Sequence, residues 1–152
     1  MQSCLKRIAA VNPAVNAVVA LDEDMAMKQA KEAEQLVMNG GTLDCIHGLP
    51  VGIKDLNPVE GLRSTWGSLI FKDHIPEQDD LMVSNIRVAG GIPFCKTNSP
   101  EFGAGANTTN RVYGATGNPF DPTLTPAGSS GGTAVALALD MMPLATGSDY
   151  GG

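Results

Sequence analysis

Residues 128–132, with the sequence Gly-Ser-Ser-Gly-Gly, are the feature that most constrains how this chain can fold. Three glycines permit backbone conformations that are closed to other residues, and they let another segment approach the two hydroxyls closely. The stretch that follows, residues 133–139, is small and apolar, which predicts a buried helix. We therefore expect Ser129 and Ser130 at a helix N-terminus, where unpaired amides and the helix dipole favour negative charge.

Other structures that contain such a run are a flexible linker, a phosphate-binding loop, a capping turn and a nucleophile elbow. A linker is solvated and repetitive, whereas this run lies between a Pro-rich turn and an apolar stretch. A Walker loop ends in Lys followed by Ser or Thr, and this run ends in Gly132-Thr133. The elbow of α/β-hydrolases fits Gly128-x-Ser130-x-Gly132 but needs a strand before the serine and a histidine after it. A proline precedes the run and both histidines lie upstream, so we reject the elbow; the capping turn stays open.

Lys54 lies near the end of residues 48–55, an apolar run that predicts a short strand over 49–53. Burial at the end of a strand disfavours the charged form of lysine and lowers its pKa. A neutral lysine can take a proton from a serine hydroxyl, directly or through an intervening hydroxyl. Alternatively, Lys54 is a half-exposed lysine paired with Asp55. An exposed ion pair is the commoner arrangement for an isolated lysine. The presence of the serine run in the same chain favours the interpretation of Lys54 as a base.

The rest of the chain alternates helices and strands, which predicts a layered α/β domain. We expect helices over residues 3–10, 22–38 and 80–89, and strands over 14–21, 92–96 and 143–146. Residues 100–118 are rich in Gly, Ala, Asn and Thr, which predicts a long surface loop. The last strand leads into the turn 147–152, whose successive backbone amides are suited to an oxyanion hole.

At these residues the sequence resembles the amidase signature family, serine hydrolases of carboxamides that use a Ser–cis-Ser–Lys triad. The resemblance extends over nearly the whole chain, with motifs at residues 48–55, 96–98, 100–102, 117–119, 128–132 and 147–152. It implies a mixed β-sheet with helices on both faces, of which only part is encoded in this chain. The predicted fold class is therefore α/β.

The resemblance also implies roles for individual residues. Lys54 corresponds to the catalytic base, and Ser129 to the bridging serine on the cis peptide bond. Other positions take their roles from the same motifs: Gly128, Ser130 and Gly131 belong to the catalytic loop, Tyr150, Gly151 and Gly152 provide oxyanion-hole amides, and Phe102, Gly103, Ala104 and Gly105 are candidate substrate contacts.

The sequence departs from the family at its end, because the nucleophilic serine of the family follows the second glycine of the last motif. In this chain that glycine is Gly152, the final residue. Ser148 precedes the Asp of the motif and occupies its small-hydroxyl position, so it does not take the nucleophile's role. We expect residues 1–152 to be the N-terminal part of a single amidase signature domain, truncated before the nucleophile and inactive as given.

Composition excludes several classes of function. The chain has 10 Lys plus Arg against 16 Asp plus Glu, and a net charge of −6 argues against a nucleic-acid or anionic-membrane partner. No apolar stretch approaches the ~18 residues of a membrane span, and the N-terminal residues lack a signal-peptide core. Three cysteines and two histidines show no zinc-ligand spacing, so we expect no metal and no cofactor. The odd cysteine count favours the cytoplasm.

Two functional hypotheses follow. The first is an amidase that hydrolyses the carbon–nitrogen bond of a small-molecule amide through an acyl-enzyme, with a homodimer as an option for the full-length form. The second is an A-type subunit of the glutamine-dependent tRNA amidotransferase, or a non-catalytic fragment. Residues 101–107 resemble the stand-alone amidases more than the amidotransferase subunits.

Overall fold

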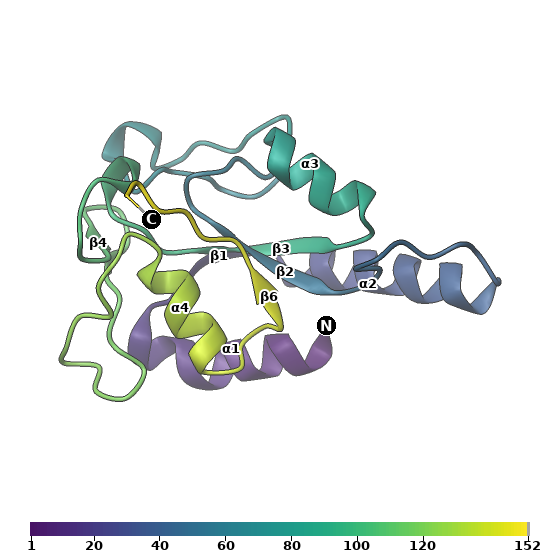
Figure 1. The fold of residues 1–152 in the computed structure, drawn as a ribbon, viewed down its shortest axis with the longest axis horizontal. Coiled ribbons are helices and arrows are strands. Elements are labelled where there is room, and N and C mark those ends of the chain that lie inside the picture. The colour runs from purple at the N-terminus through teal and green to yellow at the C-terminus, as the bar shows by residue number, and fades with distance from the viewer. Residues whose placement is uncertain (152) are drawn as a thin grey trace.

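The computed structural model describes residues 1–151, and its centre is a four-stranded sheet (Figure 1). The order across this sheet is β1 (Val18–Leu21), β3 (Ile92–Thr97), β2 (Pro50–Lys54) and β6 (Leu144–Ala145). Strand β2 runs parallel to both β3 and β6, and β1 runs antiparallel to β3. The sheet is therefore mixed, as the sequence predicts.

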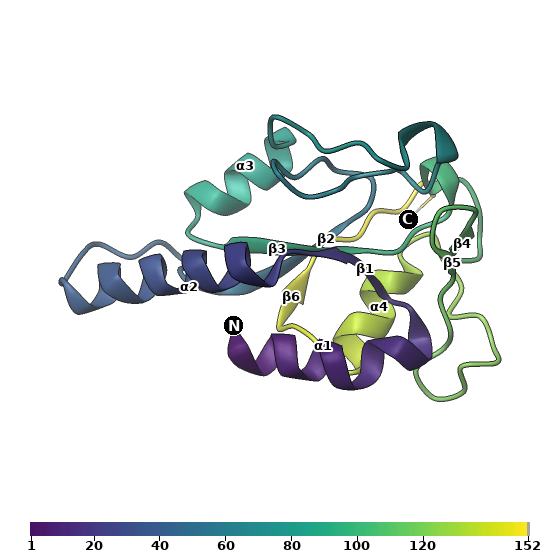
Figure 2. The ribbon, with the colours of Figure 1, turned by 180° about the vertical axis from the view of Figure 1, so that it is seen from behind.

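Helices cover both faces of this sheet. Figures 1 and 2 show α3 (Leu81–Val88) on one face and both α1 (Gln2–Val15) and α4 (Gly131–Ala138) on the other. Helix α2 (Glu23–Met38) contacts β3 and extends beyond the end of the sheet. Among the described residues, no helix combines the length and the apolar character needed to cross a membrane.

Two apolar clusters hold the layers together. The larger one joins α1, α2 and α4 to the sheet through residues such as Ile8, Phe94 and Val135. The smaller one joins α3 to β2 through Val83 and Ile53. Burial of such side chains contributes about 1.5–3 kcal/mol each, so these clusters fix the helices on their faces.

Helix starts agree with the capping residues in the sequence. The Asp22 carboxylate accepts the Met25 amide at the start of α2, and Asp80 does the same for Met82 at the start of α3. Helix α4 begins directly after Ser130, whose side chain makes no capping bond. The serine pair thus lies at a helix N-terminus, as predicted. The Ser130 hydroxyl does not cap the helix, so the capping-turn alternative is wrong for this side chain.

The predicted boundary between the first helix and the first strand is wrong. Helix α1 continues through Pro13 to Val15, and β1 starts only at Val18. The reason lies in two asparagines. Asn16 adopts a left-handed conformation with φ 51° and caps the helix, while Asn12 Oδ1 accepts the amides of Ala17 and Val18 at 2.9 and 2.8 Å.

The segment predicted as a long loop contains short regular structure. A 3-10 turn, η2, covers Glu101–Gly103, and β4 (Thr109–Asn110) pairs with β5 (Gly114–Ala115) as a small hairpin. A second 3-10 turn, η1 (Leu69–Phe71), packs nearby through the Phe71 ring, 6.4 Å from that of Phe102. Strands β2, β3 and β6 end at the same edge of the sheet, and α4 begins there. In open α/β sheets this edge is the usual place for a ligand.

Candidate active site

Lys54, the last residue of β2, places its amine among three serine hydroxyls. Its Nζ lies 2.7 Å from Ser129 Oγ, 2.9 Å from Ser130 Oγ and 2.9 Å from Ser148 Oγ. Ser129 and Ser130 come from the segment before α4, whereas Ser148 follows β6. The contact between Lys54 and Ser129 that the sequence predicts is therefore present.

The environment of Lys54 favours its neutral form. The residue is 1% exposed, and burial lowers the pKa of its amine below the ordinary value of 10.5. The nearby carboxylate of Asp149 opposes this shift. A buried amine with a lowered pKa is available as a base over a wider range of pH than an exposed lysine.

Asp55 is not the partner of Lys54. Its carboxylate instead lies 3.4 Å from the Lys96 amine, and both residues are buried. The alternative of a half-exposed Lys54 paired with Asp55 is therefore wrong, because Lys54 is buried against the serines and the Asp55 carboxylate contacts Lys96.

The loop that carries the serines is shaped by its glycines. The peptide bond between Gly128 and Ser129 is cis, as the family resemblance implies for the bridging serine. Thr108 Oγ1 donates to the Ala127 carbonyl at 2.9 Å and accepts the Gly131 amide at 3.0 Å. A Cβ on Gly131 would lie 2.2 Å from Thr108 Oγ1, so only glycine allows this approach.

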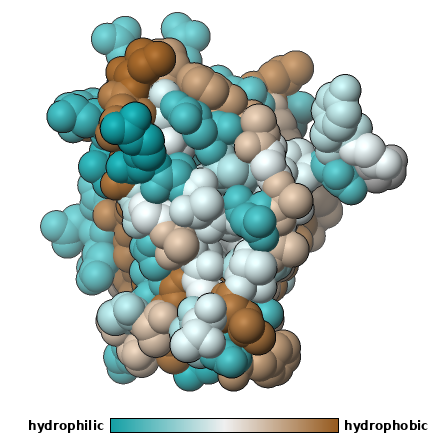
Figure 3. Space-filling model, turned by 90° about the vertical axis from the view of Figure 1, so that its left-hand side faces the viewer, coloured by the Kyte–Doolittle hydropathy of each residue, from teal (hydrophilic) through white to brown (hydrophobic). Residues whose placement is uncertain are grey.

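A cavity of about 610 Å³ opens beside Ser129. It is bounded on one side by η2 and the residues after it, and on the other by the turn after β6. The residues predicted as substrate contacts line it together with two of the predicted oxyanion residues: Phe102, Gly103, Ala104, Gly105, Tyr150 and Gly151. Figure 3 views this side of the molecule, where the surface is a patchwork of hydrophilic, neutral and hydrophobic residues.

The oxyanion candidates differ in what the structure shows. The Gly151 amide donates to Asp149 Oδ1 at 3.2 Å, so it must release this carboxylate before it can bind an oxyanion. Tyr150 lies at the cavity with its side chain in solvent. Gly152 lies outside the described residues, and its predicted role is left as a prediction.

Only two of the three hydroxyls around Lys54 are free to give the amine a proton. Ser130 Oγ donates to the Ser148 carbonyl and accepts the Ser148 amide, both at 3.1 Å. Within residues 1–151, Ser129 Oγ has Lys54 as its one hydrogen-bond partner, so its proton can turn toward a neutral amine. Ser129 also lines the cavity, whereas Ser148 does not. Ser129 is thus the hydroxyl placed between the base and the cavity.

Three residues at this site were not among the sequence candidates. Ser148 contacts the amine directly, Thr108 holds the serine loop, and Thr146 Oγ1 accepts the Lys54 backbone amide at 2.9 Å. Ser148 could have been found from the sequence, because it occupies the small-hydroxyl position of the motif at residues 147–152. No sequence pattern indicates Thr108 or Thr146, because their contacts depend on how segments far apart in the sequence pack together.

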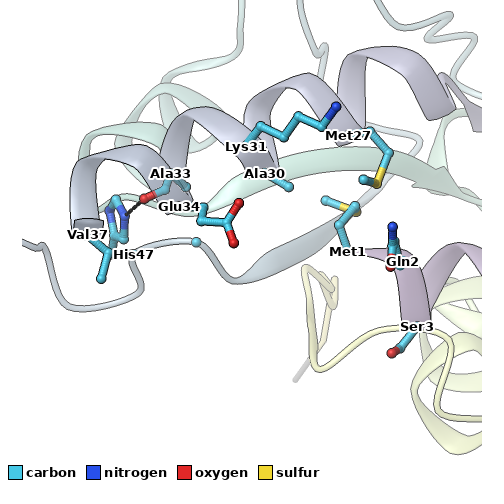
Figure 4. A pocket seen from close by; sticks show the side chains of 11 residues that line it. Met1, Gln2, Ser3, Met27, Ala30, Lys31, Ala33, Glu34, Val37 and His47 are labelled. Carbon is cyan, nitrogen blue, oxygen red and sulfur yellow. Dashed lines mark hydrogen bonds between the residues drawn. The ribbon is translucent and has the colours of Figure 1, made fainter. Parts of the chain in front are cut away.

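A second hollow of about 560 Å³ lies between the N-terminus of α1 and helix α2 (Figure 4). His47 Nε2 lies 3.0 Å from the Ala33 carbonyl there, and the sulfur atoms of Met1 and Met27 face the same space. This hollow contains none of the predicted site residues, so we do not assign the chemistry to it.

A sequence model of the family described as Amidase matches residues 1–152. The chain belongs to the amidase family. A curated relative is the A-type subunit of the glutamyl-tRNA(Gln) amidotransferase of Azoarcus sp. (strain BH72), which is 42% identical over 148 residues. The match covers 97% of this chain and 30% of that relative, so the chain spans about a third or less of the length of the proteins it resembles.

Solved structures agree with the amidase family. One is an inhibitor-bound chain from a vestigial protein complex related to the origins of an s-triazine catabolic enzyme. It is 32% identical, has a TM-score of 0.93, and is matched over 99% of this chain and 33% of its own. A crystal structure of an amidase is 36% identical with a TM-score of 0.88, over 99% of this chain and 34% of its own. The mixed sheet with helices on both faces is thus the amidase fold, represented by about a third of its length.

Proposed function

We propose that the protein containing these residues hydrolyses the carbon–nitrogen bond of a small carboxamide through a Ser–cis-Ser–Lys acyl-enzyme. The observation that carries the proposal is the 2.7 Å contact between the buried Lys54 amine and Ser129 Oγ at the edge of a cavity. No other hydroxyl in the described part of the chain both contacts this amine and lines that cavity.

The proposed reaction moves a proton from the attacking serine through Ser129 to Lys54. Neutral Lys54 accepts the proton of Ser129, and Ser129 accepts the proton of the attacking serine, whose oxygen then bonds to the carboxamide carbon. Backbone amides after Asp149 stabilise the negative oxygen that forms. The proton returns through Ser129 to the leaving nitrogen as the carbon–nitrogen bond breaks, and water then hydrolyses the acyl-enzyme.

The attacking serine is a separate part of the proposal. By the family motif it follows Gly152, so residues 1–152 supply the base, the relay and part of the oxyanion hole, without the nucleophile. We propose that these residues alone do not hydrolyse amides. A protein expressed from the complete coding sequence is the form in which the function is to be tested.

The cavity favours a neutral, partly apolar substrate. Phe102 lines it and is 53% exposed, and most of the other described lining residues are glycine and alanine. Asp149 is the one ionisable side chain besides Tyr150 among the described lining residues. A substrate carboxylate would therefore meet a negative charge there and no positive one within the described wall.

A second candidate is an A-type subunit of the tRNA-dependent amidotransferase. It is favoured by the 42% identity to a protein of that kind. Glutamine would be its amide donor, and partner subunits would be needed. The cytoplasmic location, the homodimer and the absence of nucleic-acid or membrane partners stay predictions from the sequence under either candidate.

Ammonia release distinguishes the candidates. The purified protein is incubated with propionamide, benzamide and glutamine, and ammonia is measured with a coupled enzyme. We expect release from the two simple amides to exceed that from glutamine. Preference for glutamine would support the amidotransferase candidate, and no release from any of the three would contradict amide hydrolysis.

The pH dependence follows from the state of Lys54. The base must be neutral, so kcat/KM rises with pH as the amine loses its proton, and the midpoint lies below the ordinary lysine value of 10.5. Because the Asp149 carboxylate raises this pKa, Asp149→Asn moves the midpoint of the rise to lower pH. A pH–rate profile of both proteins checks this. A midpoint that stays in place, or moves upward, contradicts the assigned charge effect.

Phe102 is expected to set the preference for aromatic substrates. Phe102→Ala removes its ring from the cavity wall, and we expect KM for benzamide to rise about 10- to 100-fold with a smaller change for propionamide. Phe120→Ala is the matched control, because Phe120 is 92% exposed and does not line the cavity. Steady-state kinetics with the two substrates decide. Equal effects of the two substitutions would exclude Phe102 from the substrate site.

A further inference from the structure

A buried ion pair lies behind the catalytic edge of the sheet. Lys96, in β3, is 0% exposed, and its amine contacts the Asp55 carboxylate at 3.4 Å and Ser64 Oγ at 3.0 Å. The same amine donates to the Asn57 carbonyl. Burial lowers the pKa of Lys96 to about 8, and the Asp55 carboxylate opposes that shift. The three residues that the Lys96 amine contacts, Asp55, Asn57 and Ser64, all follow Lys54 closely in the sequence.

One end of this pair holds the turn that carries Lys54. Asp55 follows Lys54 directly, and the Lys54 carbonyl accepts the amides of Leu56 at 2.7 Å and Asn57 at 3.1 Å. The bond from Lys96 to the Asn57 carbonyl closes this turn from the other side. A shift of Lys96 would therefore move the backbone from which the Lys54 side chain departs.

The other end of the pair holds the wall of the cavity. Asp55 Oδ2 accepts Thr65 Oγ1 at 2.7 Å, and Thr65 Oγ1 in turn accepts the Gly67 amide at 3.0 Å. The Trp66 carbonyl, between them, accepts the Phe102 amide at 2.7 Å. Asp55 is thus connected, through two residues, to the backbone that presents Phe102 to the cavity.

Stability alone is a weak reason for this arrangement. Taking two charges out of water costs as much as their attraction returns in many proteins, and an apolar pair of similar volume is often no less stable. What the charged pair adds is a fixed geometry, because its hydrogen bonds are directional. They join the turn after Lys54, at Asn57, to the segment that contains Ser64 and Thr65.

We propose that Lys96 and Asp55 are positioning residues that hold the Lys54 amine and the Phe102 wall in one fixed arrangement. The proposal rests on the proposed function, because the arrangement matters for amide hydrolysis. Neither residue lines the cavity, so both act through others.

The test uses the protein expressed from its complete coding sequence and a double variant, Asp55→Asn with Lys96→Met. Removing both charges together leaves no unpaired buried charge. We expect the folded double variant to lose about 10- to 100-fold in kcat for propionamide, because a small displacement of a catalytic group has effects of this size. The exposed pair Lys72–Asp73, with side chains 60% and 80% exposed, gives the matched control Asp73→Asn with Lys72→Met, for which we expect no change.

A second readout does not depend on activity. Competitive acetylation of the folded protein with acetic anhydride over a range of pH, followed by peptide mass spectrometry, reports the titration of Lys54. Loosening of the turn should move its midpoint toward the ordinary, higher value in the double variant. If the unmodified protein hydrolyses no amide, the proposed function fails, and this titration still decides the positioning role.

Thr65→Val tests the hydrogen-bond connection from Asp55 through Thr65 to Phe102, and it keeps the buried Lys96–Asp55 pair. It removes the two bonds of the Thr65 hydroxyl, to Asp55 and from the Gly67 amide, and it keeps the bonds from the Thr65 backbone amide to Asp55. We therefore expect a higher KM for benzamide with kcat nearly unchanged. If the double variant does not fold, this variant decides alone. A folded double variant with unchanged kcat and unchanged Lys54 titration, or a Thr65→Val protein with unchanged KM, overturns the proposal.

Discussion

Lys54→Met is expected to abolish amide hydrolysis, with kcat reduced at least about 10³-fold. Methionine fills the buried space of the lysine stem and has no amine to accept the Ser129 proton. Three hydroxyls then lose their shared partner, since Lys54 Nζ contacts Ser129, Ser130 and Ser148 within 2.9 Å. Steady-state release of ammonia from propionamide measures the loss.

The matched control is Lys28→Met, which removes an exposed lysine from α2. It should retain full activity. Ser129→Ala should resemble Lys54→Met, because the relay and the base act as one unit. A Lys54→Met protein that keeps its fold and more than a tenth of its activity would contradict the assignment of the base.

Gly132→Ala is expected to cause the largest loss of stability of any single methyl addition in α4. A Cβ at this position would lie 2.4 Å from the Asn98 amide nitrogen, 2.5 Å from the Asn98 carbonyl oxygen and 2.9 Å from the Ala17 carbonyl oxygen. These are backbone atoms of β3's end and of the segment before β1, so they cannot turn aside as a side chain would. We expect a loss of at least about 3 kcal/mol in the free energy of unfolding.

Urea unfolding followed by circular dichroism measures this loss, with Ala134→Gly as the control. Ala134 is exposed on the same helix, and its replacement should cost about 1 kcal/mol through helix propensity. If Gly132→Ala costs no more than Ala134→Gly, then α4 does not pack on the end of β3 as closely as described. The serine loop, which precedes α4, would then be less tightly fixed.

The regular elements could be predicted where the signals are local. Asp22 and Asp80 cap α2 and α3, and the glycines after each helix end it, so these boundaries needed no knowledge of the tertiary fold. The start of β1 could not be predicted in this way. It depends on the Asn12 side chain, which accepts the backbone amides of residues 17 and 18.

The candidate site was predictable where a motif places residue types in a fixed order. Lys54, Ser129 and the cavity residues beginning at Phe102 belong to such motifs, and the structure brings them together. Asp55 shows the limit of this reasoning. Its neighbour in sequence is Lys54, but its partner is Lys96, 41 positions on, because the adjacent strands β2 and β3 bring that amine to the Asp55 carboxylate.

The position of the acyl group is the measurement that tests the central claim most directly. The protein expressed from its complete coding sequence is mixed with a slowly turning over aryl ester, quenched in acid and digested, and the acylated peptide is identified by mass spectrometry. We predict one acyl group, on the serine that we propose after Gly152, and we predict that Lys54→Met forms no acyl group. An acyl group on Ser129, Ser130 or Ser148, or formation that does not require Lys54, would contradict the account.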